Sequence, residues 1–199
     1  MRYDLIIAGV GGQGILSIAT VIGRAALRQG LHLKQSEVHG MAQRGGAVSS
    51  HFRLSDRTIY SDLIPLTSAD LILSMEPMEA LRYRPWLKPE GWVVTNSVPI
   101  ASIADYPDPN LLQEALAGIQ HRIVVDAVGL ARAEKSPRSV NMAVLGAASP
   151  CIPFAAEVWE EAIREQFSRK GAEVVDANIR VFQAGRNEAT RLAASMNKA

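Results

Sequence analysis

The sequence contains a single cysteine, Cys151, and this scarcity excludes several kinds of site. One thiol cannot form a disulfide within the chain. It also cannot hold an iron–sulfur cluster, which needs about four thiolates. Because Cys151 lies between Pro150 and Ile152, we expect a small buried residue and not a nucleophile.

Long apolar runs and an excess of one charge are missing as well. No uninterrupted apolar run reaches about 18 residues, so we expect no membrane span. No leader-like segment precedes the first apolar run, so the expected location is cytoplasmic. The formal net charge is only +1 and the basic residues are scattered, so we expect no nucleic-acid partner.

The residue patterns that equip most stand-alone enzymes are also absent. There is no Walker A sequence, no G-x-S-x-G and no C-x-x-C. The four histidines lack the spacing of metal ligands and no carboxylate pair accompanies them, so we predict no metal site. No pair of nucleophile and general base can be named, which leaves the chain poorly equipped to be an enzyme on its own.

What the chain does contain is a G-x-G-x-x-G, the segment GVGGQG at residues 9–14. It follows an apolar run at 3–8 and precedes a helical pattern at 15–29, so strand, turn and helix are expected in that order. In such a turn the backbone can approach an anion, which the helix N-terminus attracts. The residues of this predicted anion-binding turn are Gly9, Gly11, Gly12, Gln13 and Gly14.

The other periodicities predict an α/β fold with a doubly wound, mostly parallel, Rossmann-like sheet. A strand at 46–54 with alternating polar residues, followed by a returning strand at 58–60, predicts a small antiparallel insertion with one half-exposed face. From residue 127 onward the pattern is helical. The further predicted elements are strands at 31–38, 69–75, 91–96 and 121–126, a short helix between Pro77 and Pro85, and a helix at 110–118.

The glycine turn alone leaves three readings open. A dinucleotide site for NAD(P) or a flavin needs an acidic residue at the tip of the second strand. Glu37 is the only nearby acid, and His39 and Gly40 follow it closely, so the fingerprint is incomplete. The alternatives are a different phosphate-bearing group or a turn that only joins a strand to a helix.

A second glycine-rich segment, HGMAQRGG at residues 39–46, follows the second strand. We expect it at the carboxyl edge of the sheet, beside the first glycine turn, where open α/β sheets bind ligands. Loops that combine glycines with hydrogen-bond donors often bind a ligand or dock a partner. The candidate contacts are the side chains of His39, Gln43 and Arg44 and the backbone of Gly40, Gly45 and Gly46.

Taken together, these segments resemble the gamma subunit family of 2-oxoacid:ferredoxin oxidoreductases, and within it the small beta subunit of the indolepyruvate type. The resemblance spans nearly the whole chain, which implies one gamma-type catalytic domain over residues 1–199. The segments that carry it are GVGGQGI at 9–15, SEVHGMAQRGGAVSSHFRLSD at 36–56, ADLILSMEPMEALR at 69–82, NMAVLGAA at 141–148, and the pattern Asn178, Phe182, Gly185. Asn141 joins the candidate site through this resemblance.

The resemblance implies an enzyme complex that oxidatively decarboxylates a 2-oxoacid, here an aryl-pyruvate, to an acyl-CoA and reduces ferredoxin. Thiamine diphosphate, Mg²⁺ and [4Fe-4S] clusters would lie on a large alpha subunit, so this chain would bind no cofactor alone and be inactive alone. We hypothesise that its two glycine loops face that partner, where the acyl intermediate meets coenzyme A. The alternatives are a free-standing NAD(P)- or flavin-binding oxidoreductase and a purely structural scaffold.

Overall fold

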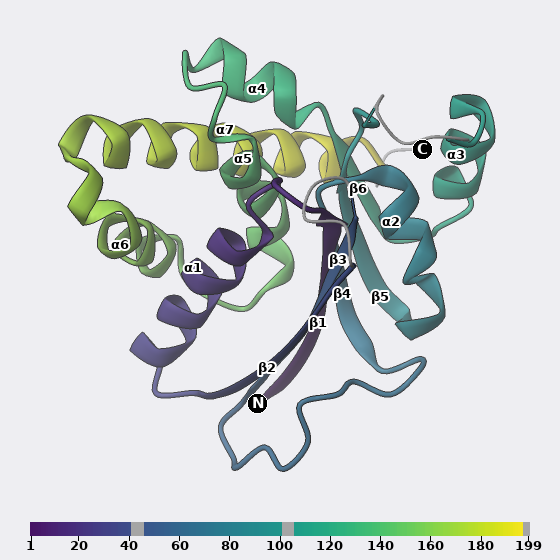
Figure 1. Ribbon diagram of the computed structural model, residues 1–199, viewed down its shortest axis with the longest axis horizontal. Coiled ribbons are helices and arrows are strands. Elements are labelled where there is room, and N and C mark those ends of the chain that lie inside the picture. Colours follow the sequence, from purple (N-terminus) through teal and green to yellow (C-terminus); the bar gives the residue numbers. More distant parts are fainter. Residues whose placement is uncertain (41–45, 101–105, 197–199) are drawn as a thin grey trace.

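One mixed sheet organises the chain, and the computed structural model describes it over residues 1–40, 46–100 and 106–196. The strand order is β2-β3-β1-β4-β5-β6, and β1, β4, β5 and β6 run parallel. Figure 1 shows helices on both faces of this sheet, which confirms the predicted doubly wound fold. The strands are β1 (Arg2–Val10), β2 (His32–His39), β3 (Ala47–Ser55), β4 (Ala69–Ser74), β5 (Leu87–Asn96) and β6 (Arg122–Val125).

The antiparallel part of the sheet is β3, which pairs antiparallel with both β1 and β2. The predicted antiparallel insertion is therefore present, but the prediction of a returning strand at residues 58–60 is wrong, because these residues form no strand. Both edges of β3 are already hydrogen-bonded to β1 and β2, so neither edge is free to pair with a further strand. Because β3 lies between them, β2 and β1 are not neighbours in the sheet.

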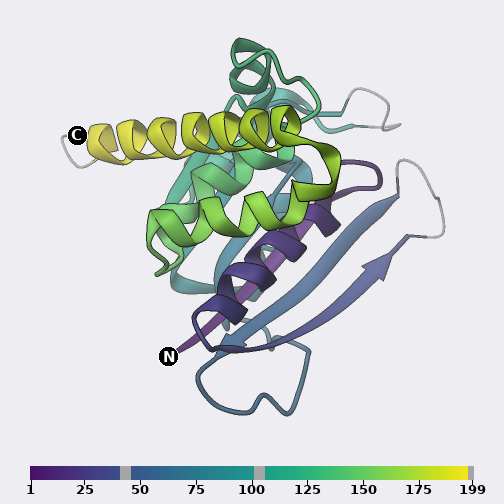
Figure 2. The ribbon, with the colours of Figure 1, turned by 90° about the vertical axis from the view of Figure 1, so that its left-hand side faces the viewer.

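The helices divide between the two faces. Helices α1, α5, α6 and α7 cover one face, and α2 and α3 cover the other, while α4 lies at the carboxyl edge of the parallel strands (Figures 1 and 2). This confirms the predicted helical C-terminal third. The helices are α1 (Ile15–Arg28), α2 (Pro77–Arg82), α3 (Pro109–Ala117), α4 (Ala127–Ala133), α5 (Val140–Ala148), α6 (Ala156–Phe167) and α7 (Ala172–Met196), with short 3-10 turns at Arg84–Trp86, Ser149–Cys151 and Ser168–Lys170.

The core on the α5 and α7 face depends on a close helix crossing. A Cβ atom on Gly146 of α5 would lie 2.8 Å from the carbonyl carbon of Phe182 on α7, and closer still to its oxygen. A Cβ atom on Gly185 of α7 would likewise lie 2.8 Å from the carbonyl carbon of Ala143. The two backbones therefore touch, and only glycine fits at either position.

Cys151 lies at the end of α5's 3-10 extension and is half-buried. Burial raises the pKa of its thiol to about 12. Thiolate is therefore scarce at neutral pH, which agrees with the expectation that this cysteine is no nucleophile.

Residues 56–68, which we call the strap, run without helix or strand from β3 to β4 and cover the polar face of β3. The prediction that this face is half-exposed is wrong at Arg53, which is only 8% exposed. Its guanidinium pairs with the buried Asp4 at 2.8 Å and donates to the carbonyl oxygens of Ser61 and Leu63 at 3.1 and 2.8 Å. The strap thus supplies acceptors that satisfy a buried cation.

Replacing Arg53 by methionine should lower the free energy of unfolding by about 3 kcal/mol, because the carboxylate of Asp4 would stay buried without its main partner. Arg2 remains within 2.8 Å of Asp4, which keeps the loss below that of a fully orphaned charge. Urea unfolding measures the change, with the exposed Arg57→Met variant as the matched control. A loss below about 1 kcal/mol would show that the pair is not needed.

Stability should also fall in mild acid through His51, whose Nδ1 accepts the amide hydrogen of Ile64 at 3.0 Å. Burial lowers the pKa of His51; nearby Asp62 opposes this shift, and Arg53 adds to it. Because the folded state prefers neutral histidine, this contribution is complete above the unfolded pKa of about 6.5 and is lost as the pH falls below it. Urea midpoints between pH 7.5 and 5.5 should fall less in His51→Asn than in the wild type. Equal slopes would contradict the assignment.

Candidate functional site

The first glycine turn is held from within by the side chain of Gln13. Its Oε1 accepts the amide hydrogen of Val10 at 2.7 Å, and its Nε2 donates to the carbonyl oxygen of Met75 at 3.2 Å. Val10 ends β1 and Met75 directly follows β4, so Gln13 ties together the carboxyl ends of two adjacent parallel strands. The side chain is therefore committed to the fold of the turn.

The amides of the turn divide into bonded and free groups. The Gly11 amide donates to the carbonyl oxygen of Gly46 at 2.9 Å, and the Gln13 amide donates to that of Val10 at 3.1 Å. Within the described ranges, the amides of Gly12 and of residues 14–16 have no acceptor. These amides stand at the N-terminus of α1, a helix of 14 residues. They are the donors that an incoming anion can use.

Asn141 of α5 closes the turn from the other side. Its Nδ2 donates to the carbonyl oxygen of Gly14 at 3.3 Å. Gly14 itself has φ 80°, in the left-handed region, and a Cβ atom there would lie 3.2 Å from the side-chain carbon of Asn141. Gly14 and Asn141 therefore fit one another, which gives a physical reason for their joint presence in the resemblance.

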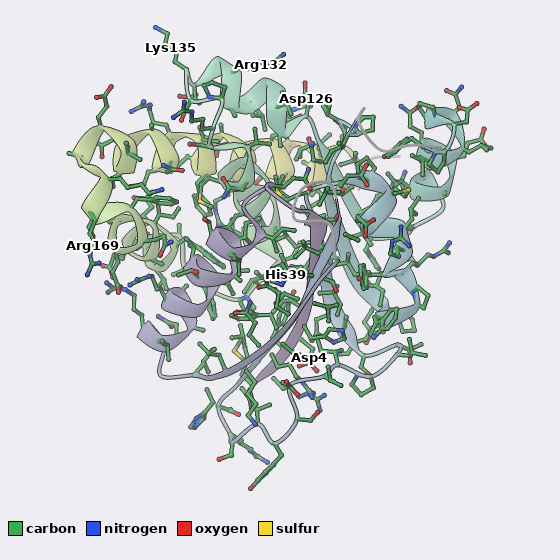
Figure 3. The ribbon with its side chains drawn as sticks, viewed as in Figure 1. Asp4, His39, Asp126, Arg132, Lys135 and Arg169 are labelled. Carbon is green, nitrogen blue, oxygen red and sulfur yellow. The ribbon has the colours of Figure 1, made fainter. Side chains whose placement is uncertain are left out.

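A hollow of about 620 Å³ opens in front of this helix N-terminus. Three cationic residues line it, Lys135, Arg138 and Lys170, against the single acidic residue Glu173. Lys135 lies beyond the end of α4, at the top of the molecule in Figure 3. The other lining residues are Gly12, Gln13, Gly14, Ser17, Ser136, Ser139, Asn141, Phe167, Val174, Ala177 and Asn178.

The chemistry of this hollow suits a phosphate-bearing ligand. The dipole of α1 adds partial positive charge where its free amides point, and lysine and arginine provide strong charge-assisted donors. Hydroxyl and amide groups from Ser17, Ser136 and Asn141 add neutral partners. A hollow with an excess of cations and free backbone donors binds an anion more readily than it binds a neutral or cationic molecule.

Sequence reasoning missed all three cations of the hollow. Lys135 and Arg138 lie about 120 residues beyond the glycine turn in a short connection between two helices, and no periodicity brings them to it. The one available signal was the segment EKSPRS at residues 134–139, where cations and serines gather in a loop. Lys170 follows α6 and is brought in only by helix packing.

The second glycine loop begins and ends where it was expected. Gly46 accepts the hydrogen bond of Gly11, so the two glycine segments are neighbours at the carboxyl edge of β1. Gly40 lies opposite, its amide 2.9 Å from the carbonyl oxygen of Ala47. His39 is exposed, and its Nε2 contacts the carboxylate of Glu37. The predicted contacts Gln43, Arg44 and Gly45 lie outside the described residues.

The position of Glu37 disfavours a dinucleotide site. In the dinucleotide-binding fold the acidic residue ends the strand next to β1. Here β3 intervenes, so Glu37 on β2 lies two strand spacings away from β1, about 10 Å. Its carboxylate also accepts a hydrogen bond from Gln35 at 3.1 Å and pairs with His39.

The structure can also be searched for a metal site and for a membrane-spanning helix. Among them, no group of three or more His, Cys, Asp or Glu side chains is placed to hold a metal ion. No helix in that part of the chain is both long enough and apolar enough to cross a membrane.

Comparison with known proteins identifies the family. Residues 4–188 match the family described as pyruvate ferredoxin/flavodoxin oxidoreductase. The chain belongs to this family. It is 37% identical, over 198 residues, to the indolepyruvate oxidoreductase subunit IorB of Archaeoglobus fulgidus, a match that covers 95% of this chain and 96% of that subunit. The resemblance seen in the sequence is thereby confirmed.

Solved structures show the same fold. A 2-oxoglutarate:ferredoxin oxidoreductase from Magnetococcus marinus, with 2-oxoglutarate, coenzyme A and succinyl-CoA bound, matches 96% of this chain and 31% of its own, with a TM-score of 0.75 and 24% identity. The pyruvate oxidoreductase subunit PORC from Thermotoga maritima matches 94% of this chain and 96% of its own, with a TM-score of 0.70 and 23% identity. At such identities the likeness establishes the fold alone.

Proposed function

We propose that this chain is the small subunit of an indolepyruvate-type 2-oxoacid:ferredoxin oxidoreductase, acting as one gamma-type domain over residues 1–199. The nearly full-length similarity to a subunit named for indolepyruvate supports an aryl-pyruvate as the substrate. The complex converts the 2-oxoacid to an acyl-CoA and passes electrons to ferredoxin.

The reactive groups belong to a larger alpha subunit in this proposal. A single cysteine cannot hold a [4Fe-4S] cluster, and the described residues place no carboxylate cluster for the Mg²⁺ of thiamine diphosphate. This chain's residues therefore do not fit those cofactors. Thiamine diphosphate and the iron–sulfur clusters, bound to the partner, would supply the chemistry of decarboxylation and electron transfer.

The hollow at the N-terminus of α1 is the observation that supports a role for this chain in the reaction, namely binding coenzyme A. Coenzyme A bears a diphosphate and a separate 3′-phosphate, so it needs several anion-binding groups at once. The free amides of Gly12 and Gly14 and the side chains of Lys135, Arg138 and Lys170 offer them in one place. We assign the phosphate-bearing end of coenzyme A to this hollow.

The remaining candidate residues shape the approach to that hollow. Gln13 and Asn141 keep the glycine turn in position. Gly11 joins the turn to the second loop through Gly46, and we assign that second loop, with Gln43 and Arg44, to the contact with the partner. In this arrangement the chain orients coenzyme A so that its thiol reaches the acyl group formed on the alpha subunit.

Competition in the assembled complex tests this assignment. Adenosine 3′,5′-bisphosphate, which carries the 3′-phosphate of coenzyme A without its thiol, should compete with coenzyme A. NAD⁺ and FAD at the same concentrations should not. Tight binding of a dinucleotide by the isolated chain would instead support the free-standing oxidoreductase. Full turnover after both glycine loops are altered would favour the structural scaffold.

A further inference from the structure

The connection between α4 and α5 holds Lys135 in a backbone conformation that normally belongs to glycine. Lys135 has φ 55°, in the left-handed region, where a Cβ atom is unfavourable. Its amide donates to the carbonyl oxygen of Arg132 at 2.9 Å, and the amide of Ser136 donates to that of Ala131 at 2.9 Å. These two bonds define a Schellman motif, whose left-handed position is usually glycine. The chain therefore carries a lysine where glycine would end the helix with less strain.

Contacts within the protein do not explain that lysine. Its side chain is exposed at the outer end of α4 (Figure 3). The preceding acid, Glu134, pairs with Arg180 of α7 at 3.6 Å, and among the described residues Lys135 forms no ion pair. Another cation of the hollow, Lys170, lies instead over the ring of Phe167, 5.4 Å from its centroid. A strained backbone that the fold does not require is frequent where the side chain has a function.

Two helix N-termini contribute to the hollow, and their chemistry differs. At α1 the glycine turn offers free amides, and the turn contains no cationic residue. At α5, a helix of nine residues, the amides of Val140 and Asn141 have no acceptor in the part of the chain that the structure describes. The loop before α5 adds Lys135 and Arg138 to the lining. The hollow thus has an amide subsite at α1 and a cationic subsite at α5.

The phosphates of coenzyme A are also of two kinds. Its diphosphate carries one negative charge on each phosphorus, whereas its 3′-phosphate is a monoester with a charge of about −1.5 to −2 near neutral pH. A diphosphate suits a glycine turn, where backbone amides approach it closely at a helix N-terminus. The more highly charged monoester gains most from charge-assisted hydrogen bonds to lysine and arginine. Charge complementarity therefore directs the 3′-phosphate to the cationic subsite.

We propose that residues 135–138 form a subsite for the 3′-phosphate, and that Lys135 makes the complex select coenzyme A over its 3′-dephospho form. This assignment rests on the proposed function of the hollow and names a residue that determines its specificity. It also accounts for the strained backbone, because glycine at position 135 would relieve the strain but remove the selecting cation.

The test measures, in the assembled complex, the KM for coenzyme A and for 3′-dephospho-coenzyme A, which keeps the diphosphate and the thiol. Lys135→Gly should raise the KM for coenzyme A at least about tenfold, because a hydrogen bond to a charged group is lost. The KM for the dephospho form should stay within about twofold of the wild-type value. The thermal unfolding midpoint of the chain should not fall, because glycine suits the left-handed position. Lys135→Arg should keep the preference for coenzyme A.

Arg132→Ala is the matched control, because it removes one positive charge from an exposed position of the same helix without removing a residue that lines the hollow. Both KM values should stay at their wild-type levels in this variant. An equal loss of preference for coenzyme A in Arg132→Ala would show that net charge, and not the subsite, selects the ligand.

The remaining outcomes separate this subsite from the proposed function. An equal rise in both KM values in Lys135→Gly would place the diphosphate at this segment, overturning the subsite and leaving coenzyme A in the hollow. Unchanged KM values for both forms would overturn the role of Lys135. If adenosine 3′,5′-bisphosphate did not compete with coenzyme A in the wild-type complex, the proposed function of the hollow would fail and the subsite with it.

Discussion

Replacing Gly146 by valine is expected to lower the free energy of unfolding by more than about 3 kcal/mol, and to unfold the protein if its stability is marginal. The first side-chain carbon would collide with the backbone of Phe182, and a main-chain atom cannot turn aside as a flexible side chain can. The two helices would have to separate, which would open the core around the fully buried Trp159.

Urea unfolding followed by tryptophan fluorescence measures this loss, because the indole of Trp159 lies 6.1 Å from the ring of Phe182, centroid to centroid. Gly118→Ala is the control, since a Cβ atom there has no neighbour closer than 3.5 Å. It should change the stability by less than about 0.5 kcal/mol. A Gly146→Val protein as stable as this control would show that the helix crossing is looser than described.

The second large effect is expected on the KM for coenzyme A. In the assembled complex, replacing Lys135 and Arg138 together by alanine should raise the KM for coenzyme A by at least about 100-fold, because two hydrogen bonds to charged groups contribute together at least about 3 kcal/mol. The KM for the 2-oxoacid should not change. The kcat at saturating coenzyme A should stay close to the wild-type value, since these side chains bind the ligand far from its reacting thiol.

Arg132→Ala provides the matched control for this experiment. Arg132 lies on α4 close to Lys135 (Figure 3). It is not among the residues that line the hollow. Its loss lowers the net charge by one unit, against two units in the double variant, without removing a residue that lines the hollow. If Arg132→Ala raised the KM as much as the double variant, long-range charge and not the hollow would explain the effect. An unchanged KM in the double variant would place coenzyme A elsewhere.

Local patterns predicted the start of the fold well. The β1–turn–α1 unit follows from neighbouring residues, since an apolar run, two glycine steps and an amphipathic helix each act over a few residues. The buried residues of α6, Trp159, Ala162, Ile163 and Phe167, recur at helical spacing, the kind of signal that predicted a helical pattern from residue 127 onward.

Long-range packing could not be predicted in the same way. Nothing within β3 shows that it inserts between β1 and β2, because register and neighbours depend on pairings with distant segments. The half-exposed assignment of β3 failed for this reason, since the cover of Arg53 comes from the carbonyl groups of the strap. The cations of the hollow are likewise assembled from separate helix ends.

Gly185 shows what a family resemblance adds to physical reasoning. On the sequence alone, a glycine within α7 lowers helix propensity and gives no sign of its purpose. The resemblance marked it together with the 141–148 segment, and the structure explains the pairing through the contact between Gly185 and Ala143. The glycine at position 185 is therefore explained by the close crossing of α5 and α7.

Reduction of ferredoxin with an aryl-pyruvate and coenzyme A, measured for each purified subunit and for their mixture, tests the central claim most directly. The claim is that this chain provides backbone, shape and phosphate-binding groups, while its partner provides the reactive cofactors. We predict turnover by the mixture alone, with no thiamine diphosphate or iron in this chain. Turnover by the isolated chain, or thiamine diphosphate or iron bound to it, would contradict the account.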